Sequence, residues 1–181
     1  MSFILVIPLF AQDFKIQIEN QFTDYNILLA EKQFEKALTN YENEHYLELV
    51  PKDQLVSLMN EMFNSSEINF ILEKPHDVVI SDEIIEQNGE KFVKIDYQQN
   101  FEMKFNNPNL ARYTIYSSLK NEFGSENVEF DKETGYFLIS TNKVAVGKSR
   151  DLQSWKFSIL EKKSIPILIK FIPEQYLKNL K

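Results

Sequence analysis

The side chains that could carry acid–base or metal chemistry in this sequence are few and widely separated. The 181 residues include two histidines, His45 and His76, and no cysteine. The histidines have no ligand spacing to each other or to paired carboxylates, as a zinc site would need. No G-x-S-x-G turn presents a serine. Each of the four glycines is accounted for by a turn or, at Gly124, by a predicted helix C-cap, so no phosphate-binding loop is expected. The sequence therefore predicts no metal, no cofactor and no catalytic residue.

Two polar side chains of one extended segment are more informative. From Val93 to Phe105 every second residue is apolar except Gln99, and every residue between them is polar. Because successive side chains of a strand point to opposite faces, Asp96 is expected to face solvent, where a carboxylate is a poor general base at neutral pH. Gln99 falls on the buried face, where an unpaired amide costs about 1–3 kcal/mol. It is either a satisfied structural amide, the site of a bulge, or a residue that lines a pocket.

Aromatic residues accompany Gln99. Tyr97 and Phe101 flank it on the same face, and Trp155 begins another alternating segment. Such residues are also typical of an ordinary core. If the strand bends around a cavity, we predict that Tyr97, Gln99, Phe101 and Trp155 contact a small apolar ligand there.

The elements that must position these residues follow from the apolar spacing. Helical spacing predicts three N-terminal helices, over 13–30, 34–41 and 51–63. A period of two then predicts strands, with a helix over 110–123 between them and a short helix after Pro173. The expected strands are 68–72, 78–87, 93–105, 128–130, 136–146, 155–159 and 165–172, the last a central strand because it is apolar on both faces. Asn88–Gly89 predicts a tight hairpin, and the polar interruption Ser81–Glu83 predicts a bulge or a change of face.

Helices followed by hairpin-linked strands indicate an α+β fold. We expect N-terminal helices packed in a strongly curved, mainly antiparallel sheet, one extra helix between strands and a short C-terminal helix. Curvature is expected because the segment 93–105 is far longer than a usual strand of about 5–6 residues. Residues 12–181 are predicted to form one domain.

Charge and the N-terminus restrict the partners and the location. The net charge of −7, with no run of Lys or Arg, argues against nucleic acid or an anionic membrane as partner. Phe3 to Ala11 is an unbroken apolar run before a polar segment, which predicts a signal peptide remnant over residues 1–11 and a secreted or periplasmic protein. The alternative is a buried N-terminal strand in a cytoplasmic protein. Nine residues are too few to span a bilayer.

This arrangement resembles a known superfamily. The residues that carry the resemblance are Val50–Pro51–Lys52 at the start of the third helix and Trp155–Lys156–Phe157 in a late strand. With the curved sheet, they are similar to the cystatin-like cone fold of nuclear-transport-factor-like proteins, ketosteroid isomerases and SnoaL-type cyclases. The segments 47–63 and 155–180 also resemble uncharacterised secreted proteins of Bacteroidetes-type bacteria. The resemblance implies a cone-shaped sheet; the enzymes of the superfamily hold an Asp base and a Tyr or acid donor inside it.

Three functions are compatible with these observations. The leading hypothesis is a secreted or periplasmic domain without catalysis that binds a small apolar ligand, or a segment of a partner, in the cavity of the curved sheet. The second is an isomerase or cyclase with Asp96 or Asp82 as base and a Tyr as donor, which needs a carboxylate inside the cone. The third is a purely structural or interaction domain, which predicts no cavity.

Overall fold

The structure, a computed structural model, describes residues 9–107, 109 and 111–180 and is an α+β fold. Among these residues, no helix combines the length and apolar character needed to cross a membrane. The α-helices are α1 (Leu9–Ala30), α2 (Phe34–Tyr41), α3 (Glu44–Leu49), α4 (Lys52–Phe63), α5 (Arg112–Phe123), α6 (Ile165–Leu168) and α7 (Glu174–Leu177). The described residues also form the 3₁₀ turns η1 (Ser125–Asn127), η2 (Lys162–Ser164) and η3 (Lys178–Leu180).

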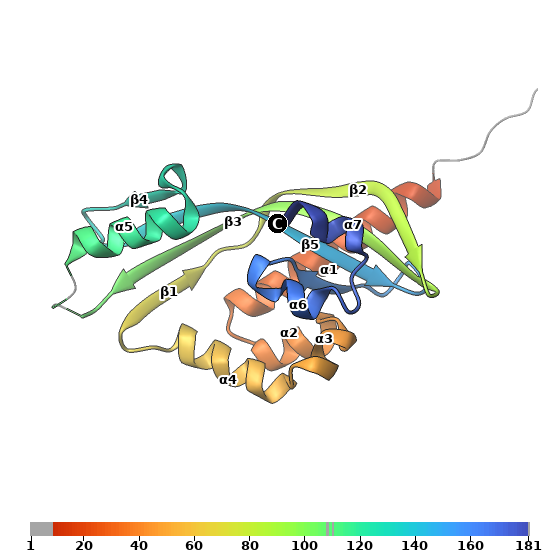
Figure 1. The fold of residues 1–181 in the computed structure, drawn as a ribbon, viewed down its shortest axis with the longest axis horizontal. Coiled ribbons are helices and arrows are strands. Elements are labelled where there is room, and N and C mark those ends of the chain that lie inside the picture. The colour runs from red at the N-terminus through yellow and green to blue at the C-terminus, as the bar shows by residue number, and fades with distance from the viewer. Residues whose placement is uncertain (1–8, 108, 110, 181) are drawn as a thin grey trace, which may run out of the picture.

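One antiparallel sheet forms the centre of the molecule (Figure 1). Its strands are β1 (Ile68–Leu72), β2 (His76–Gln87), β3 (Glu90–Phe105), β4 (Val128–Phe130), β5 (Phe137–Ser149) and β6 (Lys156–Ile159). The long strands β3 and β5 pair along almost their whole length. At one end β2 and β6 flank this pair, and at the other end β1 and β4 do. The sheet is therefore four strands wide at each end, and β3 and β5 are its shared spine.

Local sequence signals explain how β2 meets β3. Asn88 and Gly89 have φ values of 54° and 75°, the left-handed conformation that a two-residue hairpin turn requires. The pairing register of β2 shifts between Ile80 and Ile84, so the ladder is irregular at the polar interruption, as predicted.

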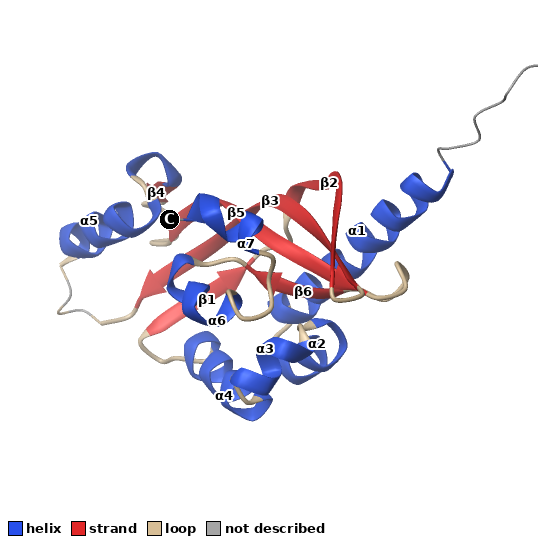
Figure 2. Cartoon of the chain, turned by 45° about the vertical axis from the view of Figure 1, so that its right-hand side comes forward, coloured by secondary structure: helices blue, strands red, loops and turns tan. Residues whose placement is uncertain are grey.

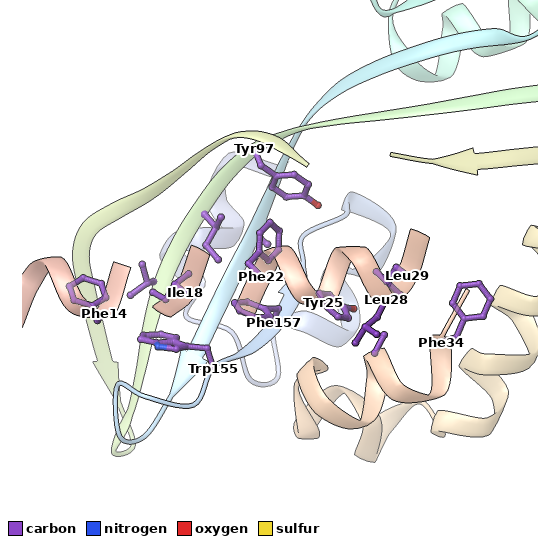
Figure 3. Close-up of a cluster of buried hydrophobic side chains, with 14 of the residues drawn as sticks. Phe14, Ile18, Phe22, Tyr25, Leu28, Leu29, Phe34, Tyr97, Trp155 and Phe157 are labelled. Atoms are coloured by element: carbon purple, nitrogen blue, oxygen red, sulfur yellow. The ribbon is translucent and has the colours of Figure 1, made fainter. Parts of the chain in front are cut away.

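Two apolar clusters cover opposite faces of the sheet at the end formed by β2 and β6. On one face, α1 packs against the odd-numbered side chains of β3, including Val93, Ile95 and Tyr97. Figure 3 shows Phe22 of α1 among these side chains, where its ring lies 5.0 Å from that of Tyr97 in an edge-to-face arrangement. On the other face, Phe92 belongs to a separate cluster with side chains of α6 and α7. The predicted alternation of β3 is thus confirmed.

A third cluster lies at the far end of the sheet, where α5 packs against β3, β4 and β5. Phe101 of β3 contacts Phe123 of α5 with ring centroids 5.3 Å apart. Gly124 ends α5 with a φ of 96°, so the predicted glycine cap is confirmed. In Figure 1, α5 and β4 lie together at this end of the molecule.

The prediction of a central strand over 165–172 is wrong. Ile165–Leu168 forms the short helix α6, and the following residues are turns. Leu168, Phe171 and Ile172 are buried against the sheet, whereas Ile169 is 55% exposed. A short apolar run cannot distinguish a buried strand from a buried helical turn, and Pro166 suits the first turn of a helix because its missing N–H is not needed there.

The N-terminal helices differ from expectation in two respects. Helix α3 was not predicted; it is capped by the Asn43 side chain, which accepts a hydrogen bond of 3.1 Å from the backbone N–H of His45. The predicted signal peptide remnant, residues 1–11, lies mostly outside the described residues, and residues 9–11 belong to α1. The first buried side chain described in α1 is Phe14.

Candidate functional site

The four residues predicted to contact a ligand do not line one common cavity in the described structure. Tyr97 and Trp155 are buried in the cluster around α1, whose side chains fill that face of the sheet. Phe101 belongs to the cluster around α5 and lines a separate surface pocket of about 310 Å³. Gln99 is buried between the two clusters, at 6% exposure.

Gln99 makes hydrogen bonds that belong to the sheet. Its Nε2 donates to the backbone oxygens of Glu73, at 2.7 Å, and Asn100, at 3.0 Å. Glu73 follows the last residue of β1, at the point where β3 changes its partner from β1 to β2. The amide therefore ties the β1–β2 connection to β3 where ladder pairing is interrupted, which is the geometry of a structural amide.

Replacing Gln99 with Leu is expected to reduce the free energy of unfolding by about 1–3 kcal/mol, because the Glu73 carbonyl would lose its partner. Urea unfolding measures this loss. Gln98→Leu, on the opposite face of the same strand, is the matched control and should change stability by under about 0.5 kcal/mol. Unchanged stability of Gln99→Leu together with altered ligand binding would favour the pocket-lining alternative instead.

Neither carboxylate considered as a base lies in an enclosed space. Asp96 pairs with Lys94 at 2.7 Å, and its side chain is 48% exposed. Asp82, whose side chain is 95% exposed, pairs with Lys15. A carboxylate inside the molecule is nevertheless present, at a position that sequence analysis did not single out.

That carboxylate is Glu42, which lines a pocket of about 430 Å³ at the β6 edge of the sheet. Of the helices that contribute to the pocket, α2, α3 and α4 lie together below the sheet in the view of Figure 2. The wall of the pocket is mainly apolar, and Met62, which is half exposed, marks an opening to solvent. The lining residues are Tyr25, Leu38, Glu42, Tyr46, Leu55, Met59, Met62, Ser158, Ile159, Glu161, Ser164 and Leu168.

Backbone contacts hold Glu42 in this pocket. Its N–H caps α2 by donating to Leu38, and the residue forms a parallel bridge with Phe157 of β6. The next N–H, that of Asn43, donates both to the Phe157 carbonyl and to Glu42 Oε1, each at 3.1 Å. The Tyr25 hydroxyl of α1 donates to Oε2 at 2.9 Å. The carboxyl group is therefore fixed by α1, α2 and β6 together.

Burial dominates the electrostatics of this group. Glu42 is 9% exposed, and burial raises its pKa from 4.5 to about 7, although the hydrogen bonds from Tyr25 and Asn43 and the charge of Lys156 oppose the shift. Burial and the nearby Glu42 also raise the pKa of Tyr25 well above 10 and that of Tyr46 above 10. At neutral pH the pocket thus holds a carboxyl that exchanges between its acid and its carboxylate, beside two neutral phenols.

Ser158 adds a second polar group to the pocket. Its Oγ is buried and has no hydrogen-bond partner among the described residues. A buried hydroxyl without a partner is costly, and such groups in native proteins commonly mark a bound water or ligand. Glu42 and Ser158 are therefore two polar anchors in a mostly apolar wall.

A second polar region, between α3 and the start of β3, is an ion network. Glu90 Oε1 accepts from Lys148 Nζ at 3.1 Å and from Arg150 Nε and Nη2 at 3.1 and 2.9 Å. Burial disfavours the carboxylate, but Arg150 and Lys148 outweigh this and lower the pKa of Glu90. His45 Nε2 lies 3.5 Å from the other oxygen. Because Lys148 and Arg150 compensate the negative charge of Glu90, we interpret this network as structural.

No cluster of three or more potential metal ligands occurs within residues 9–107, 109 and 111–180. Comparison with models of known protein families and with curated proteins finds no match for this chain. The site must therefore be interpreted from its own geometry.

Little in the sequence indicates that Glu42 is buried. It begins the polar segment 42–44, where no apolar period predicts burial. Only its tertiary contacts with Phe157 and Tyr25 bury it. The one local signal is that it directly follows the apolar stripe of α2, which ends at Tyr41.

Proposed function

We propose that this protein binds a small, mostly apolar ligand with one polar group in the pocket beside Glu42. The observation that carries the proposal is the combination of an apolar wall with a buried, raised-pKa carboxyl and an unpartnered Ser158 hydroxyl. Ligand sites commonly join an apolar lining to a few convergent polar groups, in volumes of about 300–1,000 Å³. The proposed pocket lies at the β6 edge of the sheet, whereas the sequence suggested the face around Gln99.

A neutral fluorescent probe, N-phenyl-1-naphthylamine, tests this proposal. Leu55 lines the pocket from α4, and Leu58 on the same helix is 53% exposed and is not among the lining residues. We expect saturable fluorescence enhancement with the native chain, at least tenfold weaker binding to Leu55→Trp, because the larger ring occupies the pocket, and native-like binding to Leu58→Trp. Absence of saturable binding, or equal loss in both variants, would contradict the proposal.

A second candidate function, an isomerase or cyclase, is favoured by one observation. A carboxyl with a pKa near 7 suits a general base at neutral pH, and Glu42 accepts a hydrogen bond from the Tyr25 hydroxyl. Native mass spectrometry of protein purified from its source would reveal a retained small molecule. If that molecule gains carbon-bound deuterium on incubation with the protein in heavy water, catalysis is supported; an unchanged molecule supports binding alone.

We also propose membership of the cystatin-like superfamily and export from the cytoplasm. The open antiparallel sheet with α1 against one face supports the first. The apolar run from Phe3 to Ala11 supports the second.

A further inference from the structure

We infer that the ligand of the Glu42 pocket carries a protonated amine on an apolar body, and that the amine pairs with the Glu42 carboxylate. This inference rests on the proposed function, since it names the chemical class of the same ligand. The charge of the wall supports it: Glu42 and Glu161 line the pocket, and its described lining includes no Lys, Arg or His. An anionic ligand would meet two carboxyl groups and no compensating cation.

The nearby cations do not neutralise Glu42. The Lys156 ammonium donates to the backbone oxygens of Thr39 and Asn40, at 3.3 and 2.6 Å. Lys143 forms an ion pair with Glu161. Glu42 has no ion pair within 4 Å among the described residues, so a ligand cation would supply the missing counter-charge. A buried carboxylate is costly unless it is paired, and an ammonium ligand relieves that cost.

The polar atoms of the pocket match an ammonium group. An ammonium has three donors and no acceptor. Both Glu42 oxygens are acceptors, and the unpartnered Ser158 Oγ is a third acceptor in the same wall. The apolar body of the ligand would then contact Leu55, Met59 and Leu168. A neutral alcohol could use the same atoms but would gain no ion pair.

The groups that face Glu42 predict how binding depends on pH. They are Tyr25 from α1, Tyr46 from α3, Lys156 from β6 and Glu161, which is paired with Lys143. The raised pKa values keep both tyrosines neutral near pH 7. An ammonium binds the ionised form of Glu42, so its affinity should fall as the pH drops below about 7 and Glu42 takes up a proton.

Isothermal titration with three probes of equal chain length, octylamine, 1-octanol and octanoate, tests the inference. At pH 8 we expect octylamine to bind at least tenfold more tightly than 1-octanol, and octanoate to bind more weakly than either. Between pH 8 and pH 6 the affinity for octylamine should fall by up to about tenfold, since a group with a pKa of about 7 is about nine-tenths ionised at pH 8 and about one-tenth ionised at pH 6. Glu42→Gln should lose the preference for the amine. Glu35→Gln, which removes a 75% exposed carboxylate of α2 that does not line this pocket, should keep it.

The outcomes separate this inference from the proposed function. Equal binding of octylamine and 1-octanol, or a preference for the amine that persists in Glu42→Gln, would overturn the inference. If N-phenyl-1-naphthylamine still binds in a way that Leu55→Trp abolishes, the proposed pocket stands and only the ligand class is wrong. If no probe binds, both fall.

Discussion

At pH 8, Glu42→Gln is expected to increase the free energy of unfolding by about 3 kcal/mol. Burial raises the pKa of Glu42 to about 7 from 4.5, so the folded protein holds this proton more tightly than the unfolded chain. Stability is therefore lost as the pH rises from about 4.5 to 7, at 1.36 kcal/mol per unit of pKa difference. Glutamine has the same shape and cannot ionise, so the variant avoids this loss.

Urea unfolding at pH 5 and at pH 8 measures the effect. Near pH 5 the folded protein already holds Glu42 mostly neutral, so variant and native chain should differ little. Glu35→Gln on α2 is the control, because the Glu35 side chain is 75% exposed; it should follow the native chain at both pH values. An equal effect of Glu42→Gln at pH 5 and pH 8 would show that ionisation of Glu42 is not what costs stability.

This cost is informative about function. An ionisable side chain that weakens the fold at neutral pH is typical of a functional site, where groups are placed for chemistry or binding at the expense of stability. Glu42 fits this description, since a glutamine could keep both partners without an ionisable group: its amide oxygen would accept from Asn43 N–H, and its amide nitrogen would donate to the Tyr25 hydroxyl oxygen.

In contrast to Glu42→Gln, Glu90→Leu should reduce the free energy of unfolding, by about 3–5 kcal/mol. The change leaves Lys148, at 2% exposure, with only the half-exposed Glu44 as counter-ion, 3.1 Å away. Removing one member of a buried ion pair is strongly destabilising because the other charge remains buried. Urea unfolding at pH 7 tests the prediction.

Lys148, the buried partner of Glu90, provides a control for this interpretation. The double variant Glu90→Leu/Lys148→Met should recover most of the lost stability, because replacing both charges with apolar groups is often nearly neutral. Glu48→Gln, at the exposed side of the same region, should change stability by under about 0.5 kcal/mol. A loss below about 1 kcal/mol for Glu90→Leu would contradict a structural role for the network.

Periodicity alone predicts most of this fold. The alternation from Val93 to Phe105 and the Asn88–Gly89 turn establish the long strand and its hairpin, because one buried face and two residues with positive φ leave few other solutions. The interpretation of residues 165–172 fails because an apolar run of that length lacks a period that separates strand from helix.

The candidate site could not be found in the same way. Asp96 belongs to the polar set of alternating residues in β3, and this alternation correctly predicts that it faces solvent. Alternation cannot locate Glu42, which lies in no periodic segment. Its burial depends on a strand far along the chain, since Asn43 bonds to Phe157. Long-range contacts of this kind leave no local pattern in the sequence.

The most direct test of the pocket is the pKa of Glu42, measured by carbon-13 NMR of the glutamate side-chain carboxyl carbons as a function of pH, with Glu42→Gln to assign the signal. We expect one carboxyl to titrate near pH 7, with its midpoint shifted downward when octylamine is bound. A Glu42 signal that titrates near 4.5 would mean that the carboxyl is open to water, and the pocket would lose the feature on which its proposed function depends.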